Sequence, residues 1–409
     1  MPRRRPVHAR SIIAVSLLLS ATALTAVRAS ANDRDGRDVV DGLPNADVCE
    51  KLGFPRDRAD GDGYRFAPQK QALGGTFRSA APTLSMEAAP PPSPAPAAPV
   101  IAGGVVAADE AIGLPYDTEK YPDATSNPIK QVAEEPVSTF SIDVDTASYA
   151  NVRRFLKDGT LPPRDAVRVE ELVNYFDYGY APPSDPDTPF AIHTTVVPSP
   201  WAAGKEIIHI GLQGYDLVAD ERPPLNLVFL MDVSGSMDDP DKLPLVQKAL
   251  NVLIDELRPE DHVSIAVYAG AAGAVLEPTD GTQKLKIRCA VDAMHAGGST
   301  AGGEGLALAY KMAEQSFEKG SVSRVILMTD GDFNVGIADP EKLEDFVAEK
   351  RKTGVYLSVY GFGRGNYNDV MMQTLSQAGN GTAAYIDTLQ EAKKLFRDDF
   401  SGSLFPIAD

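Results

Sequence analysis

Five side chains with oxygen atoms are spaced along the chain in a pattern that suits a divalent metal ion. Three of them lie in one short segment, Met231-Asp-Val-Ser-Gly-Ser-Met237, and two follow at a distance. Carboxylates and hydroxyls are hard oxygen donors, which suit Mg²⁺ and, with looser geometry, Mn²⁺ or Ca²⁺. The predicted metal ligands are Asp232, Ser234, Ser236, Thr300 and Asp330.

Only two of these five side chains carry a charge. The ion would stay electron-poor, because a Ser or Thr hydroxyl offers a lone pair without neutralising the metal. At least one coordination position would remain for water or for an outside group. We expect a partner protein to complete the octahedron with an Asp or Glu carboxylate. One predicted ligand has an alternative, since Ser299 adjoins Thr300 and could exchange roles with it.

Two apolar runs would carry the two acidic ligands to one edge of a sheet. Asp232 follows the run Pro224–Met231, and Asp330 closes the run that begins at Arg324. Such continuous runs are typical of buried parallel strands. Thr300 lies in a loop ahead of a segment with an apolar helical face, residues 306–317. Ligands of open α/β sheets bind at the carboxyl ends of the strands, so the sequence predicts a metal site at that edge.

Strand-like and helix-like segments alternate throughout residues 223–400. The predicted helices are 246–257, 284–294, 343–352 and 369–378, and further predicted strands are 261–268, 274–276 and 354–360. This alternation predicts an α/β fold: a doubly wound, mostly parallel, Rossmann-like sheet with helices on both faces.

The five predicted ligands match the metal-ion-dependent adhesion site of von Willebrand factor type A (VWA) domains. That site has the pattern Asp-x-Ser-x-Ser, a distant Thr and a distant Asp, so residues 223–400 resemble this family. The resemblance implies that Asp232, Ser234, Ser236 and Thr300 contact the ion directly or nearly so, with Asp330 acting through water. The alternative is that these residues only cap helices and turns.

Residues 127–222 resemble the segment that precedes the VWA domain in a family of exported bacterial von Willebrand factor proteins. Two stretches carry the resemblance, Asp143-Val-Asp-Thr-Ala-Ser-Tyr149 and Val169-Glu-Glu-Leu-Val-Asn-Tyr-Phe-Asp177. We expect a small α+β segment with helices near 151–157 and 167–176 and strands at 190–197 and 206–212. A carboxy-terminal domain usually follows in that family, so the tail 401–409 could begin one.

Residues 1–31 have the parts of a signal peptide. A basic start with four arginines precedes the apolar stretch 11–27, and Ala29-Ser-Ala31 offers a cleavage site. We expect export to the periplasm, the cell envelope or the outside, with an uncleaved membrane anchor as the alternative. Residues 32–126 contain six prolines between Met86 and Val100, and they predict a disordered Pro/Ala-rich stalk.

The charge balance is strongly acidic. Lys and Arg number 39 against 57 Asp and Glu, which gives a formal net charge of −18. This excess opposes nucleic-acid binding and direct membrane binding by the folded part. The neighbouring acids Asp238, Asp239 and Asp241 predict a solvated loop, with a second ion as the alternative. Cys49 and Cys289 are predicted to be unpaired thiols, because one lies in the stalk and the other in an apolar helix; pairing after export is the alternative.

No nucleophile, base or cofactor motif accompanies the metal pattern, so we expect a binding module in adhesion or scaffolding and not an enzyme. A metal-assisted hydrolase would need a general base, and only Asp332 is near in sequence. A phosphatase of the haloacid dehalogenase type could use Asp143 and Asp145, but Ala147 stands where those enzymes need Thr or Val. A third possibility is a structural envelope protein with an idle site.

Overall fold

The structure is a computed structural model, and it describes residues 46–54, 118–123, 128–139, 142, 144–185, 188–215, 222–269, 272–297, 302–331, 333, 340–399, 402 and 404–405. The predicted signal peptide, most of the predicted stalk, and the residues Asp143, Ser299, Thr300 and Asp332 lie outside this part of the chain. Within it, no helix has the length and apolar character needed to span a bilayer.

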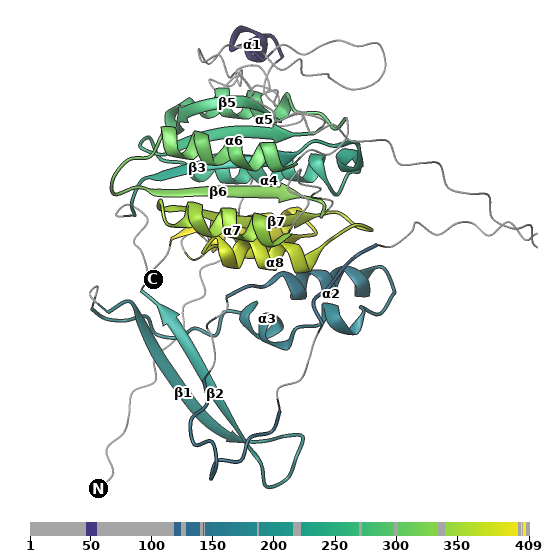
Figure 1. Ribbon diagram of the computed structural model, residues 1–409, viewed down its shortest axis with the longest axis vertical. Coiled ribbons are helices and arrows are strands. Elements are labelled where there is room, and N and C mark those ends of the chain that lie inside the picture. The colour runs from purple at the N-terminus through teal and green to yellow at the C-terminus, as the bar shows by residue number, and fades with distance from the viewer. Residues whose placement is uncertain are drawn as a thin grey trace, which may run out of the picture.

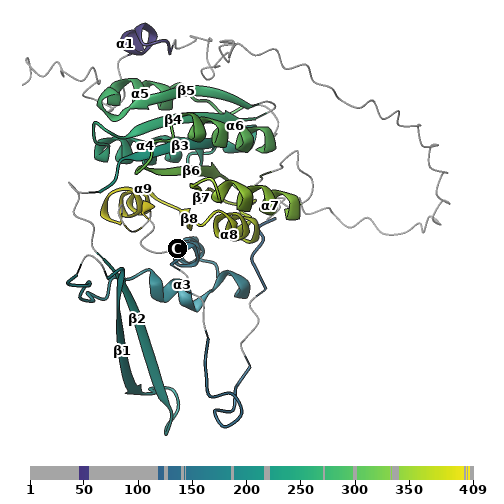
Figure 2. The ribbon, with the colours of Figure 1, turned by 60° about the vertical axis from the view of Figure 1, so that its left-hand side comes forward.

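The apolar runs of the sequence form the centre of a six-stranded sheet with the order β5-β4-β3-β6-β7-β8 (Figures 1 and 2). All neighbouring strands are parallel except β5, which runs antiparallel to β4. Every residue of β3 is buried, as expected for a strand covered on both faces. The strands are β3 (Leu225–Asp232), β4 (His262–Tyr268), β5 (Ala272–Asp280), β6 (Val322–Thr329), β7 (Val355–Phe362) and β8 (Ala383–Ile386).

Helices cover both faces of this sheet, so the predicted doubly wound α/β fold is confirmed. Successive β3 side chains alternate between two cores: Phe229 packs with the first group of helices and Val228 with the second. The first group is α4 (Leu243–Glu256), α5 (Lys284–Asp292) and α9 (Leu389–Lys393), the last continued by a π-helical turn, Lys394–Asp398. The second is α6 (Gly302–Gln315), α7 (Pro340–Arg351) and α8 (Asp369–Ala378).

The segment ahead of the sheet has the predicted α+β character. It comprises α2 (Ala147–Lys157), a 3₁₀ turn (Arg164–Ala166), α3 (Val169–Asn174) and the antiparallel hairpin of β1 (Phe190–Pro198) and β2 (Glu206–Gly214). Ala147 and Ala150 of α2 join the core on the α8 side of the sheet. The hairpin extends away from the sheet, below α3 in Figures 1 and 2.

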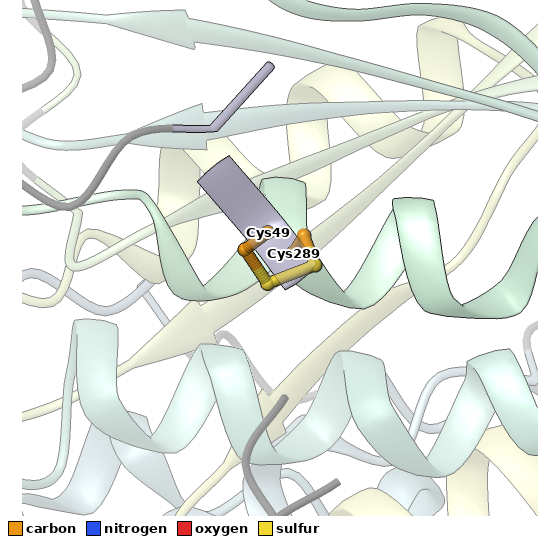
Figure 3. The surroundings of a disulfide bond; sticks show 2 residues. All are labelled: Cys49 and Cys289. Carbon is orange, nitrogen blue, oxygen red and sulfur yellow. A yellow bond between two sulfur atoms is a disulfide. The ribbon is translucent and has the colours of Figure 1, made fainter. Parts of the chain in front are cut away.

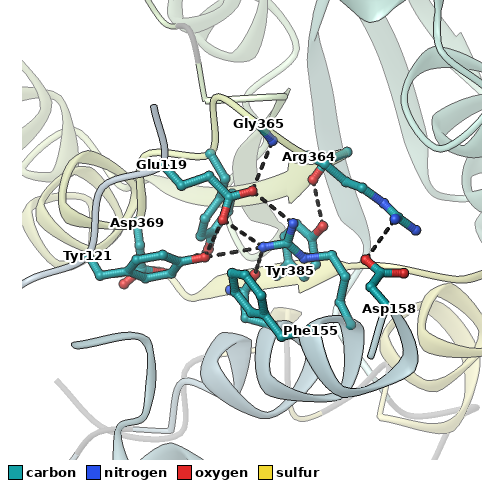
Figure 4. A network of polar contacts seen from close by, with 12 residues as sticks. Glu119, Tyr121, Phe155, Asp158, Arg364, Gly365, Asp369 and Tyr385 are labelled. Carbon is teal, nitrogen blue, oxygen red and sulfur yellow. Dashed lines mark hydrogen bonds and ion pairs between the residues drawn. The ribbon is translucent and has the colours of Figure 1, made fainter. Parts of the chain in front are cut away.

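Three arginines on α2 and before α3 hold this segment against the sheet domain. Arg154 pairs with Glu119 at 2.7 Å, beside the Tyr385 ring (Figure 4). Arg153 pairs with Asp387 and, at 2.8 Å, with Glu391, and Arg168 pairs with Glu171 and Asp369. Buried ion pairs add little net stability, but their geometry can fix one packing arrangement against others.

The prediction of two unpaired thiols is wrong, because Cys49 and Cys289 form a disulfide (Figure 3). Cys49 lies on α1 (Ala46–Lys51), and both cysteines are buried in the core on the α5 side of the sheet together with Phe54. A helix as short as α1 leaves no strong pattern in the local sequence. The two cysteines are 240 residues apart, so only the folded chain brings them together.

A second part of the predicted stalk is also folded against the domain. The backbone N–H of Lys120 donates to the Tyr367 carbonyl at 2.9 Å, and the N–H of Asp369 donates to the Lys120 carbonyl at 2.8 Å. Thr118 makes a similar contact with Gly365. Residues 118–120 therefore line the loop between β7 and α8, which corrects the prediction of disorder for this part of 32–126.

Candidate metal site

The two predicted acidic ligands lie at the same edge of the sheet. Asp232 is the last residue of β3, and Asp330 directly follows β6. The strands are parallel, and Met231 is paired with Met328, so both carboxylates emerge at the carboxyl ends of adjacent central strands. A 3₁₀ turn, Gly235–Asp238, then folds the chain back over this edge.

Hydrogen bonds join four of the five predicted ligands into one cluster. The Ser234 N–H donates to Asp232 Oδ1 at 2.8 Å, and the Ser234 and Ser236 hydroxyls are 3.0 Å apart. The Ser236 hydroxyl also bonds to the Asp330 carboxylate. Both carboxylates and Ser234 are buried, whereas Ser236 is exposed. The cluster therefore opens to solvent on the side of Ser236.

The fifth predicted ligand, Thr300, and its alternative, Ser299, lie outside the described residues. The chain that leads to them starts beside the cluster, because the Gly297 N–H donates to the Val233 carbonyl at 2.7 Å.

Asp232 is held by two groups that sequence reasoning missed. Its Oδ2 accepts from the Tyr268 hydroxyl at 3.1 Å and from the Thr329 hydroxyl at 3.4 Å. Burial raises the pKa of Asp232 to about 6, and the charge of Asp330 adds to this, while the hydrogen bonds from Ser234 and Tyr268 oppose it. A carboxylate in this state lacks a compensating positive charge, which a metal ion would supply.

Asp330 has such a charge within the protein. Lys242 Nζ lies 3.0 Å from Asp330 Oδ2 and 3.3 Å from Asn366 Oδ1. Burial alone would raise the pKa of Asp330, but hydrogen bonding by Asn366 and the charge of Lys242 outweigh it and hold the pKa below its usual value. The two carboxylates of the cluster thus differ, because one is paired with a cation and the other is not.

Two of these four missed residues had a sequence signal. Tyr268 ends a predicted strand and pairs with Asp232 across β3 and β4, and Thr329 precedes Asp330. Lys242 and Asn366 had none, because both reach the cluster from loops whose path the sheet decides.

The donor set fits a hard divalent ion. The cluster brings two carboxylates and two hydroxyls together. It differs from a site built of His, Cys, Asp and Glu alone, and among the described residues no group of three or more such side chains is placed to hold a metal. A hydroxyl-rich set of this kind suits Mg²⁺, Mn²⁺ or Ca²⁺ better than Zn²⁺. The neighbouring acidic residues have the character of a solvated loop and not of a second metal site. Asp238 and Asp239 are exposed, and Asp241 pairs with Arg364 at 3.2 Å.

Comparison with known families identifies the sheet domain. The family described as von Willebrand factor type A domain matches residues 226–398, and the family described as von Willebrand factor matches residues 115–209. The chain contains a VWA domain. Its β3, which ends at Asp232, and its β6, which leads into Asp330, are therefore the central strands of a VWA fold.

Relatives of the VWA protein occur in bacteria and animals. It is 46% identical over 298 residues to the uncharacterized protein YfbK of Escherichia coli (strain K12). This match covers 71% of this chain and 52% of YfbK. It is 33% identical over 181 residues to protein sll0103 of Synechocystis, covering 44% of this chain and 42% of that protein. Human inter-alpha-trypsin inhibitor heavy chain H4 is 31% identical over 148 residues, 34% of this chain and 16% of its own length. The chain spans about half the length of YfbK.

Solved structures with similarity to the VWA protein include metal-loaded ones. The von Willebrand factor type A protein of Catenulispora acidiphila is 20% identical with a TM-score of 0.39, covering 56% of this chain and 52% of its own. The mussel byssus proximal thread matrix protein 1 with a zinc-occupied MIDAS motif is 21% identical with a TM-score of 0.35, covering 43% and 45%. Manganese-loaded TRAP protein of Plasmodium vivax is 18% identical with a TM-score of 0.36, covering 51% and 77%.

Proposed function

We propose that this VWA protein is an exported, metal-dependent protein-binding module in adhesion or scaffolding. Asp232, Ser234, Ser236 and Thr300 hold a Mg²⁺ ion, Asp330 supports it through water, and a carboxylate of the partner protein takes the open position. The single observation that carries the proposal is the hydrogen-bonded cluster of four oxygen-bearing side chains at the carboxyl edge of β3 and β6.

The charges of the cluster favour an acidic partner. Asp232 and Asp330 bring two negative charges, and Lys242 returns one positive charge at 3.0 Å from Asp330. A divalent ion at this place keeps a net positive charge, which attracts a further carboxylate. Ser236 is exposed, so a group from another molecule can approach on that side.

The Cys49–Cys289 disulfide supports export to an oxidising compartment. Structural disulfides persist in the periplasm, at cell surfaces and outside the cell, and are rare in the reducing cytosol. The basic and apolar start of the sequence, residues 1–31, supports the same route. We propose the periplasm, the cell envelope or the exterior as the place where the binding module acts.

Two measurements test the function. Mn²⁺ binding to the full chain is followed by electron paramagnetic resonance, and partner capture from an envelope extract is compared in Mg²⁺ and in chelator. Asp232→Ala should abolish both metal binding and the metal-dependent part of capture, because it removes the buried carboxylate at the end of β3. The matched control is Asp345→Ala, which removes an exposed carboxylate on α7 and should leave both unchanged.

An idle site in a structural envelope protein predicts that capture is the same with Mg²⁺, with chelator and with Asp232→Ala. If Asp232→Ala lost metal binding while capture stayed independent of metal, the metal site would be supported and its adhesive role would be rejected.

A further inference from the structure

Lys242 is the residue directly before α4, and its side chain extends to the metal cluster. The residue is almost completely buried. Its Nζ lies 3.0 Å from Asp330 Oδ2, and the side chain of Asn366 accepts a second hydrogen bond from the same Nζ at 3.3 Å. A buried ammonium group is costly unless it is paired, so this position requires both acceptors.

The backbone around Lys242 is shaped to admit its long side chain. Gly363 has φ +73°, and a Cβ at this glycine would lie 2.3 Å from Lys242 Cγ and 2.5 Å from Lys242 Cε. Any larger residue would displace the lysine stem. The loop after β7 therefore packs directly against the Lys242 side chain that reaches Asp330.

The same loop is fixed from outside the VWA domain. The Gly365 N–H donates to Glu119 at 2.9 Å, and Arg364 pairs with Asp158 at 2.7 Å (Figure 4). Within the domain, Arg364 also pairs with Asp241 at 3.2 Å. Glu119 in turn is held by Arg154 of α2. Residues 363–368, which carry Asn366 and contact Lys242, are thus in direct contact with the segment that precedes the domain.

We propose that Lys242 is a positioning residue that pairs with Asp330 and sets the charge of the loaded site. This inference rests on the proposed function and names the residue that favours an acidic partner. With Lys242, the fixed charges sum to −1, and the loaded site carries +1. Without it the fixed charges would sum to −2, and the loaded site would be neutral.

The charge argument gives two effects of opposite sign. Removing a positive charge close to the ion strengthens the binding of the cation by Coulomb attraction to the two carboxylates. It also removes the net positive charge that draws in an external carboxylate. Damage to the fold would weaken both kinds of binding, so the opposite signs distinguish the proposed role from a structural one.

The test uses the full chain with Lys242→Met and Lys242→Gln. Mn²⁺ affinity is measured by calorimetry, and acetate is then titrated into the Mn²⁺-loaded protein while water-proton relaxation reports the exchange of metal-bound water. We expect about tenfold tighter Mn²⁺ binding and at least fivefold weaker acetate binding in both variants. Lys248→Met is the matched control, since Lys248 is exposed on α4, six residues after Lys242, and should change neither value by more than about twofold.

Gln keeps a hydrogen-bond donor for Asp330 without the charge, so Lys242→Gln decides the matter if the Met variant does not fold. Equal or weaker Mn²⁺ binding in the folded variant, or unchanged acetate binding, would overturn the role of Lys242. Failure of the proposed function is distinguishable, because it would appear as full Mn²⁺ binding in Asp232→Ala or as partner capture that is the same in Mg²⁺ and in chelator.

Discussion

Tyr268 and Asp232 stand opposite each other on neighbouring parallel strands, and the tyrosine hydroxyl donates a 3.1 Å hydrogen bond to Asp232 Oδ2. Both side chains are completely buried. This pairing keeps one carboxylate oxygen in place while burial raises the carboxylate pKa to about 6. The metal-free cluster therefore contains a negative charge that the fold does not fully compensate.

Asp232→Asn should stabilise the metal-free protein at neutral pH. The folded-state pKa of about 6 exceeds the ordinary value of 3.8, so the charged form costs stability above pH 6 and this cost disappears as the pH falls towards 4. Urea unfolding in chelator at pH 7.5 should show a gain of about 2–3 kcal/mol for the variant. At pH 4 the two proteins should agree within about 0.5 kcal/mol.

Saturating Mg²⁺ should reverse this order. The wild type gains stability by mass action when the ion binds the folded state, and the variant lacks the carboxylate that binds it. Equal stability of the two metal-free proteins at pH 7.5 would contradict a stability cost of burying the charged Asp232 side chain.

Gly363→Ala should affect the metal cluster more than Gly365→Ala. Both glycines have positive φ, 73° and 86°, so each alanine carries a similar backbone cost of about 1 kcal/mol. Only at Gly363 would the new methyl group collide with the Lys242 stem, whereas a Cβ at Gly365 has no heavy atom within 4 Å. We expect about 1–3 kcal/mol of additional destabilisation and a changed Mn²⁺ affinity for Gly363→Ala, measured by thermal unfolding and calorimetry. Equal effects of the two substitutions would show that Gly363 is not closely packed against Lys242.

Replacing both members of the disulfide, Cys49→Ser and Cys289→Ser together, should lower the free energy of unfolding by about 2–5 kcal/mol. The bridge closes a loop of 240 residues and attaches α1 to the core beside α5. Denaturant unfolding of the oxidised wild type against the double variant measures the loss. A mass increase of about 2 Da on reduction confirms the bond itself, and an unchanged mass would contradict the pairing.

Arg168→Met should destabilise the contact between the preceding segment and the VWA domain by about 3–5 kcal/mol. It leaves the buried carboxylates of Glu171 and Asp369 without their guanidinium partner. Lys352→Met is the control, because its pair with Glu349 is exposed and should contribute at most about 0.5 kcal/mol. Limited proteolysis reports whether residues 118–185 are released first. Similar effects of the two substitutions would argue against a specific role of the interface pair.

Long apolar runs allowed the core of the fold to be predicted. The strands that became β3 and β6 and the helices that became α4 and α8 were placed within a few residues of their observed ends. β8 and α9 were not predicted, because four or five residues are too few to show a period. β5 was predicted as three residues and extends over Ala272–Asp280, since its pairing with β4, which includes register shifts, decides its length.

The sequence by itself determined that oxygen-bearing side chains follow two buried strands, and parallel strands bring such residues to one edge. The tertiary structure alone decided how the cluster is charged and held. Lys242 and Asn366 come from separate loops, and Tyr268 becomes a partner of Asp232 only when β4 pairs with β3. The disulfide likewise depends on contact between residues 240 positions apart. Local patterns encode backbone periodicity, whereas contacts between distant residues arise only when the whole sheet has formed.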